Sequence, residues 1–235
     1  MPAMITKLKL VLPAILSMAV GLIAADTKPA MVVQVVETDQ VDAYVDALAK
    51  INARIKAVAG VDTLRHTWVG DQAGESSHGV FVVSSYESAA AAAALTTKMN
   101  QDAELPGMVA ALKSIRKLGP SFLYKAVRFE GLYPGGAVFN TSINCTDEDA
   151  YVKALDGLKA IFDTNGFKDA KVNLYRIVAG RSESTHLVVI CLPNTVRVAE
   201  LLDAISDKMI IKDWQAAAAK IRTTIRNGTY HEITK

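Results

Sequence analysis

The feature that most limits the fold of this chain is an internal duplication. The heptapeptide DAYVDAL at residues 42–48 returns as DAYVKAL at residues 149–155, an offset in numbering of 149 − 42 = 107. The tetrapeptide ESSH at residues 75–78 returns as ESTH at residues 183–186, an offset of 183 − 75 = 108. Solenoid units are about 20–50 residues long, so this much longer period makes each copy a small domain or half of one larger fold. The sequence therefore predicts a tandem duplication, which constrains architecture more than function.

Residues 1–25 have the pattern of an export signal. Lys7 and Lys9 precede an apolar run over residues 10–24, and small residues stand before polar Asp26. The alternative is a membrane anchor, but the run is shorter than the roughly 20 residues that span a bilayer. We expect residues 1–25 to be a signal peptide, and the mature protein to be periplasmic or secreted and free of the membrane.

Both copies show the same order of strand and helix patterns. Residues 26–130 form the first repeat, the Gly/Pro-rich residues 131–136 form a linker, and residues 137–235 form the second repeat. In the first copy we expect strands at 31–38, 63–70, 78–86 and 122–129, and helices at 41–58, 85–100 and 108–118. In the second copy we expect strands at 137–145, 171–178, 185–192 and 229–234, and helices at 148–162, 195–209 and 212–226.

This β-α-β-β-α-β order is the ferredoxin-like unit, an antiparallel sheet with the first and third strands in the middle. One such unit leaves a sheet face bare, and burying that face against a second sheet contributes roughly 25 cal/mol per Å². The predicted fold class is therefore α+β, with two tandem ferredoxin-like repeats whose antiparallel sheets pack into an intramolecular α/β barrel. We expect a monomer that is an intramolecular pseudo-dimer.

The repeated β-α-β-β-α-β order, with a second helix broken before the last strand, resembles the dimeric α/β-barrel superfamily. Within it, the antibiotic-biosynthesis-monooxygenase-like domains are the most similar, and the resemblance covers residues 31–235. It implies two sheets closed into a barrel with helices outside, and small ligands bound between one sheet and its own helices. Members include cofactor-free oxygenases, haem enzymes, polyketide cyclases, isomerases and proteins of no known activity, so the fold does not choose a function.

Charge and residue spacing exclude several classes of function. The chain has 26 Lys and Arg against 24 Asp and Glu, without basic runs, so no nucleic-acid partner is expected. The four histidines lack the spacing of metal ligands, and neither a metal nor another cofactor is expected. Cys145 and Cys191 lie on neighbouring antiparallel strands at separated positions, so we expect no disulfide between them.

The best candidate site lies on the first strand of the second copy. Asn140, Ser142 and Asn144 alternate along this strand and share one face. At an offset of 108, the first copy has valine at two of the three matching positions. This polar face is either a structural hydrogen-bond network or part of a ligand pocket between the second sheet and its helices. Asn173 and Tyr175 are the expected neighbours in such a pocket.

Two recurring histidines add a weaker signal. His78 and His186 begin the third strand of each copy, where an imidazole could act as a general base or hold the hairpin. We therefore include His186 as a pocket neighbour and a weak catalytic candidate. Arg176 is a candidate partner for an anionic ligand or an ion-pair residue at the rim.

Two hypotheses about function remain open, and the sequence does not decide whether the protein is an enzyme. The first is an exported small-molecule-binding or structural protein of the dimeric α/β-barrel type, whose partner is a small apolar or aromatic ligand. The alternative is a cofactor-free monooxygenase or isomerase of the antibiotic-biosynthesis-monooxygenase type, acting on an aromatic or polyketide-like compound. An enzyme needs an acid or base that converges with polar groups on a sheltered cavity, whereas a binding protein needs only shape.

Overall fold

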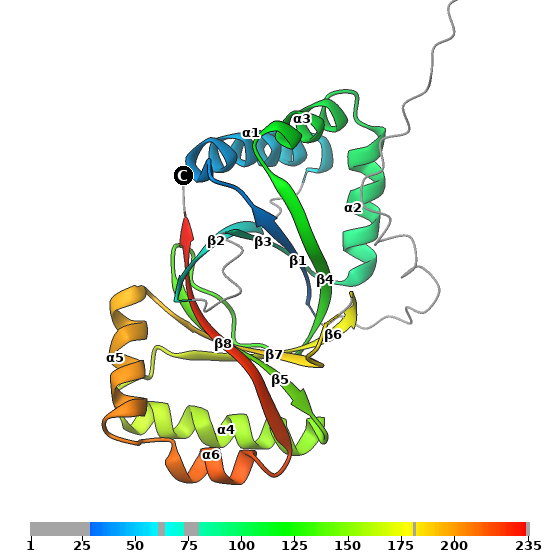
Figure 1. Cartoon of the computed structure of the whole chain (residues 1–235). Helices are drawn as coiled ribbons and strands as arrows, with labels where there is room; N and C mark the ends of the chain where they lie inside the picture. Colours follow the sequence, from blue (N-terminus) through cyan, green and yellow to red (C-terminus); the bar gives the residue numbers. More distant parts are fainter. Residues whose placement is uncertain (1–28, 61–63, 73–79, 181, 234–235) are drawn as a thin grey trace, which may run out of the picture.

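The computed structural model describes residues 29–60, 64–72, 80–180 and 182–233 (Figure 1). The expected signal peptide, residues 1–25, and His78 lie outside the described residues. None of the helices in the described ranges is both long enough and apolar enough to cross a bilayer.

The described chain consists of two halves with the same order of elements. The first half contains β1 (Ala30–Glu37), α1 (Val41–Ala59), β2 (Leu64–Gln72), β3 (Val80–Tyr86), α2 (Ala89–Gln101), α3 (Leu105–Ala111), the 3-10 turn η3 (Leu112–Ser114) and β4 (Lys117–Arg128). The second half contains β5 (Ala137–Cys145), α4 (Glu148–Thr164), β6 (Lys171–Ala179), β7 (His186–Leu192), α5 (Thr195–Ser206), α6 (Lys212–Ala218) and β8 (Arg222–Ile233).

The eight strands form one antiparallel sheet that closes on itself in the order β1-β3-β2-β8-β5-β7-β6-β4. Each half contributes four consecutive strands, with its first and third strands in the middle, and the halves meet where β2 pairs with β8 and β4 pairs with β6. The helices lie outside this ring, α1 to α3 over the first half and α4 to α6 over the second (Figure 1). The prediction of an α+β fold with an antiparallel sheet is confirmed.

The repeated heptapeptide anchors one helix in each half. It forms the first turns of α1 and α4, where Tyr44 and Tyr151 occupy matching positions and are both completely buried. Asp147 caps α4 by accepting a hydrogen bond from the Ala150 N–H at 2.9 Å. Gly60 ends α1 with φ at 68°, in the left-handed region that glycine adopts readily. The duplication therefore preserves the contact between helix and sheet.

Buried apolar side chains form three clusters. One lies between α1 to α3 and the first half of the sheet, and a second lies between α4 to α6 and the second half. The third lies inside the ring of strands and draws residues from both halves, among them Met31, Trp68, Tyr124 and Tyr230. Each half of the sheet is therefore covered on its outer face by its own helices, and the two halves share one interior.

Several expected boundaries were wrong, most of all in three places. Pro106 and Gly107 lie inside α3, because proline is tolerated in the first turn of a helix, where its missing N–H has no intrahelical partner. The strand expected from residue 122 begins at Lys117. The helix expected over 212–226 ends at Ala218, and residues from Arg222 onward belong to β8, consistent with the β-branched run TTI at residues 223–225.

Both cysteines are free, which confirms the expectation that they are not bonded to each other. On the β5–β7 ladder Cys191 lies opposite Val138, whereas Cys145 is at the far end of β5 beyond the Ile143–His186 pair. Burial raises the pKa of the Cys191 thiol to about 11, so this sulfur stays protonated at neutral pH.

Candidate functional site

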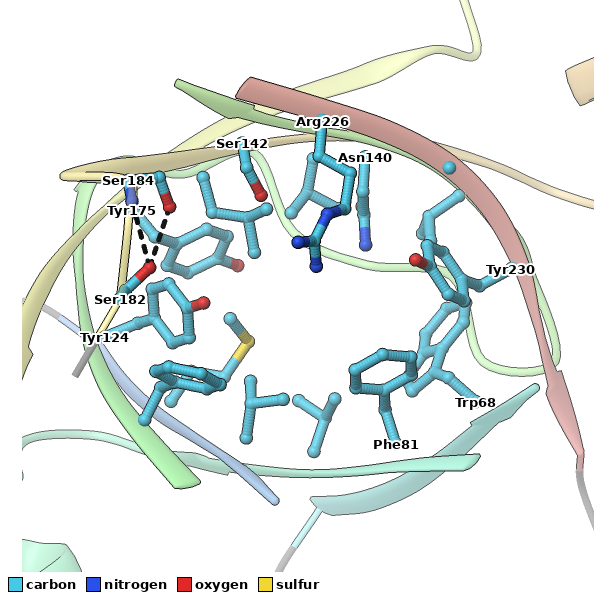
Figure 2. Close-up of a pocket in the computed structure, with 18 of the residues that line it drawn as sticks. Trp68, Phe81, Tyr124, Asn140, Ser142, Tyr175, Ser182, Ser184, Arg226 and Tyr230 are labelled. Carbon is cyan, nitrogen blue, oxygen red and sulfur yellow. Dashed lines mark hydrogen bonds between the residues drawn. The ribbon is translucent and has the colours of Figure 1, made fainter. Parts of the chain in front are cut away.

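A cavity of about 340 Å³ lies inside the ring of strands, which is within the usual size range of small-molecule pockets (Figure 2). The sequence predicted a pocket between the second half of the sheet and its helices, and this location is wrong. Apolar side chains fill the spaces under the helices, whereas the interior keeps open volume. The residues that line the cavity are Met31, Val33, Val35, Trp68, Phe81, Val83, Pro120, Phe122, Tyr124, Leu132, Val138, Asn140, Ser142, Tyr175, Ser182, Glu183, Ser184, Leu187, Val189, Ile225, Arg226, Asn227, Gly228 and Tyr230.

One end of the cavity is closed by the connector between the halves, residues 129–136, and we call it the connector end. Leu132 of this connector lines the cavity. Asn173 on β6 is completely buried and holds the connector, since its Oδ1 accepts from the Glu130 N–H at 2.7 Å and its Nδ2 donates to the Gly131 carbonyl at 3.0 Å. The Tyr133 N–H lies 3.3 Å from the Cys191 sulfur. These contacts fix the floor of the cavity.

A buried contact between a histidine and a carboxylate adds to the connector end. Nδ1 of His66 on β2 contacts the carboxylate of Glu232 on β8, and the side chains of both residues are about nine-tenths buried. The second carboxylate oxygen of Glu232 accepts a hydrogen bond from the Gly135 N–H at 2.7 Å. Neither side chain lines the cavity, so we assign this pair to the seam between the halves and to the position of the connector.

The opposite end lies at the β6–β7 hairpin, and we call it the hairpin end. Ser182 and Glu183 of this hairpin line the cavity and are exposed, so the cavity reaches the surface there. The hairpin is held to β5 because the Thr185 N–H donates to the Ile143 carbonyl at 3.0 Å. The hydroxyls of Ser182 and Ser184 lie 3.0 Å apart (Figure 2).

Aromatic rings form much of the cavity wall. Phe81 and Tyr230 meet edge to face with ring centroids 5.2 Å apart, and Trp68 lies beside them (Figure 2). Tyr124 and Tyr175 stand across the cavity from this group (Figure 2). Burial raises the pKa of all three tyrosines above its usual range. Their hydroxyls therefore stay protonated at neutral pH and serve as hydrogen-bond donors rather than bases.

A polar patch interrupts this wall on the second half. Asn140 and Ser142 of β5 point inward beside Arg226 of β8 (Figure 2). On the β5–β8 ladder Ser142 lies opposite Arg226, and Asn140 lies opposite Gly228. The Oδ1 atom of Asn140 is buried and has no hydrogen-bond partner among the described residues. Such an atom loses its water on folding without compensation, so a ligand that donates a hydrogen bond here would recover free energy.

The residues predicted from sequence separate into two groups. Asn140, Ser142 and Tyr175 line one cavity. Asn144 does not line it and lies near the end of β5, opposite Thr223. Asn173 belongs to the floor, where it holds the connector rather than facing a ligand.

His186 lies away from the cavity, which corrects its expected place as a pocket neighbour. Its Nε2 is 2.8 Å from a carboxylate oxygen of Glu148 at the start of α4, and its Nδ1 is 2.8 Å from the Thr185 hydroxyl. The imidazole therefore ties the hairpin to a helix, on the outer side of the sheet. Arg176 contacts the same Glu148 at 3.4 Å and is half exposed, which makes it a rim ion-pair residue.

Sequence reasoning missed Arg226 and Gly228 because a helix was expected to run to residue 226, and it missed Tyr230 although a strand was expected at 229–234. The alternation in RTTIRNGTY, residues 222–230, was the available signal: Arg226, Gly228 and Tyr230 share one face of a strand. Sequence reasoning also missed Tyr124, which lies on the face of β4 that lines the cavity. The stretch that contains it was correctly expected to be a strand.

The described cavity residues do not suit a haem group held through histidine, thiolate or tyrosinate. Haem iron takes such axial ligands. No histidine or cysteine is among the described lining residues, and burial holds the cavity tyrosines in their protonated form. Within the described ranges no three His, Cys, Asp or Glu residues gather as a metal site.

Known proteins resemble this chain in fold but not in sequence. No protein-family model matches the chain, and the curated proteins include no significant sequence match. A proposed monooxygenase from Fusobacterium nucleatum superposes with a TM-score of 0.59 at 13% identity, covering 89% of this chain and 94% of that one. A proposed chlorite dismutase gives a TM-score of 0.53 at 11% identity, covering 88% of this chain and 96% of that one.

A third solved structure, a haem-binding protein from Thermus thermophilus, gives a TM-score of 0.54 at 7% identity, covering 88% of this chain and 92% of that one. These likenesses extend over nearly the whole of each chain, so the similarity is one of complete folds. The chain therefore shares its α+β fold, with an antiparallel sheet, with these three proteins. At sequence identities this low, the structural similarity is evidence of a shared fold and not of a shared function.

Proposed function

We propose that this protein binds a small, mostly apolar molecule inside its barrel. The observation that carries the proposal is the cavity itself: a space of about 340 Å³ walled by aromatic and aliphatic side chains, with a few polar groups gathered at one place. Concave, largely apolar sites with few convergent polar groups are the usual form of small-molecule sites. The rings of Trp68, Phe81 and Tyr124 favour a ligand that itself contains a ring.

Binding has more support than catalysis. A cofactor-free oxygenase or isomerase needs a group that accepts a proton from its substrate. Among the described lining residues Glu183 is the only carboxylate, it lies exposed at the hairpin end, and no histidine accompanies it. The buried tyrosines are held in their protonated form. The monooxygenase hypothesis therefore lacks the base that its chemistry requires among these residues.

We further propose that the chain is an exported monomer built from two tandem ferredoxin-like, antibiotic-biosynthesis-monooxygenase-like repeats. The strand order supports the repeat, since β4-β1-β3-β2 and β8-β5-β7-β6 are the same arrangement. The pairing of β2 with β8 and of β4 with β6 supports the intramolecular pseudo-dimer, because it leaves no edge among the described strands for a second chain. The charge and apolar pattern of residues 1–25 supports export.

Calorimetry with 2-naphthalenemethanol, a neutral two-ring probe, tests the binding proposal. We expect one probe molecule to bind per chain, and Trp68→Leu to weaken binding by about tenfold because it removes a ring from the wall. Trp214→Phe is the matched control, since Trp214 lies on α6 outside the barrel and its indole donates to the Ala154 carbonyl. No binding to the unmodified protein, or an equal loss in both variants, would contradict the proposal.

A further inference from the structure

Arg226 places a positive charge at the cavity. It extends from β8, and its guanidinium points into the open space between the polar and aromatic walls (Figure 2). Among the described residues no carboxylate forms an ion pair with it, and Glu183, the acidic residue at the hairpin end, is not its partner. The guanidinium lies near enough to Tyr230 to offset part of the rise that burial causes in the pKa of that phenol.

Two further polar side chains face the same space. Ser142 is the ladder partner of Arg226, so its hydroxyl emerges directly beside the arginine. Asn140 lies two positions away on the same face of β5, and its buried Oδ1 has no partner in the described chain. An amide side chain both accepts and donates hydrogen bonds. Arginine, amide and hydroxyl therefore form one cluster, and its partners are absent from the described protein.

The chemistry of this cluster selects a kind of ligand. A guanidinium presents a planar fork of N–H donors that matches the two oxygens of a carboxylate. One arginine balances one negative charge on the ligand. The Ser142 hydroxyl and the Asn140 amide can donate to the lone pairs of the ligand carboxylate that the arginine leaves free, and the Asn140 Oδ1 can accept from a nearby donor on the ligand. Apart from Ser182, Glu183, Ser184 and Asn227, the other lining residues are apolar or aromatic, and no second cation is among the described residues that line the cavity.

We propose, resting on the binding function above, that the ligand is an amphipathic organic monocarboxylic acid. Its carboxylate binds Arg226 with Asn140 and Ser142 alongside. Its apolar body extends toward the connector end, where Leu132, Trp68 and Tyr230 enclose it. The arrangement of the cavity favours this orientation, because Arg226, Ser142, Ser182 and Ser184 lie toward the hairpin end, whereas the connector contributes the apolar Leu132 to the lining. A ligand of this kind enters with its apolar end first.

Two isosteric probes test the charge separately from the shape. We expect 2-naphthoate to bind the unmodified protein at least about tenfold more tightly than 2-naphthalenemethanol, since a hydrogen bond between charged groups is worth more than a neutral one. Arg226→Gln should abolish this preference and leave the affinity for the alcohol within about twofold. Arg226→Lys should keep part of the preference, because it retains the charge and loses the fork.

Arg176→Gln is the matched control, since it also removes one positive charge from the barrel wall, on the outer face beside Glu148. It should leave both affinities unchanged. If the alcohol binds and naphthoate binds no more tightly, the anion proposal fails while the binding function stands. If Arg226→Gln weakened the binding of both probes equally, Arg226 would contribute only to the shape of the cavity, and the anion proposal would also fail. If neither probe binds the unmodified protein, the binding function itself fails.

Discussion

The two halves of the barrel share their strands and helices, yet they build opposite walls around one cavity. At the same step of the ladder, Met31 pairs with Tyr124 in the first half and Val138 pairs with Tyr230 in the second. At the next ladder pair whose side chains face the cavity, the first half has Val33 opposite Phe122. The second half has Asn140 opposite Gly228. One half therefore offers bulk and an apolar surface, and the other offers space and a hydrogen-bonding group.

The difference continues toward the hairpin end. Ser142 corresponds to Val35 at the offset of the repeated heptapeptide (142 − 107 = 35), and Arg226, counted from Tyr230 and Tyr124, corresponds to Pro120. All four of these wall positions, two in each half, line the cavity. The inference from sequence compared Asn140 with residue 32, and the ladder corrects this by one position to Val33. A duplicated fold thus gains an amphipathic cavity when a few inward positions change in one copy, while the buried tyrosines of α1 and α4 stay the same.

The largest effect should come from giving the second half the side chain that the first half has. Gly228→Phe places a ring where Phe122 stands in the other wall. A Cβ at Gly228 would already lie 2.7 Å from the Tyr230 hydroxyl, so Tyr230 must shift, at a cost of about 1–3 kcal/mol in stability. We expect calorimetry to show at least about a hundredfold loss of 2-naphthalenemethanol affinity, because the ring occupies the cavity.

Gly157→Ala is the control for this change. Gly157 lies on the exposed side of α4, and a Cβ there meets nothing within 4 Å. This variant should bind as the unmodified protein does and gain about 0.5–1 kcal/mol in stability from helix propensity. If Gly228→Phe bound the probe normally, the open space beside Tyr230 would not be the binding site.

The next effect concerns the floor, where the halves also differ. Asn173 holds the connector, whereas His66, at the matching position of the first half, pairs with Glu232. Asn173→Ala should lower the free energy of unfolding by about 2–3 kcal/mol, since it leaves partly buried backbone groups of the connector without partners and opens a space at a completely buried position. Urea unfolding followed by circular dichroism measures this change.

Asn173→Asp sharpens the test of the floor, because it keeps the oxygen that accepts from Glu130 and loses the amide that donates to Gly131. At neutral pH it should be at least as destabilising as Asn173→Ala, because it places an unpaired carboxylate in a completely buried position against the Gly131 carbonyl. A loss below about 1 kcal/mol for the alanine variant would mean that the connector is held mainly by its other contacts.

The sequence was sufficient for the fold class and for most of the element order because regular patterns carry that information. The repeated heptapeptide marked both anchoring helices, and strand β5 was placed at its observed bounds, Ala137–Cys145. The alternation along β5 placed Asn140, Ser142 and Asn144 on one face, and the first two line the cavity whereas Asn144 does not. These features depend on neighbours along the chain, which the short periods of strands and helices record directly.

The cavity could not be located in the same way. Whether Asn140 faces the helices or the barrel interior depends on which side of the sheet each half buries, and alternation alone does not distinguish the two faces. The pairing of β8 with β5 joins Arg226 to Ser142, which lie far apart in the sequence. His186 and Asn173 were misplaced for a related reason, since a buried polar residue in a strand looks the same whether it holds a loop or faces a ligand.

The smallest effect should come from Asn140→Val, which gives the polar wall the residue that the first half has at this step. The buried Oδ1 of Asn140 has no partner in the described protein, so its removal should raise the free energy of unfolding by about 1 kcal/mol. The same change removes a group beside Arg226, so we expect 2-naphthoate to bind about threefold to tenfold more weakly. Thermal unfolding and calorimetry on one preparation measure both quantities.

Asn144→Val is the control, because Asn144 is on the same strand but outside the cavity, and it should leave the affinity unchanged. Greater stability together with weaker binding is the combination expected of an unsatisfied polar group retained for a ligand; a loss of stability with unchanged binding would instead make Asn140 part of the scaffold, like Asn173.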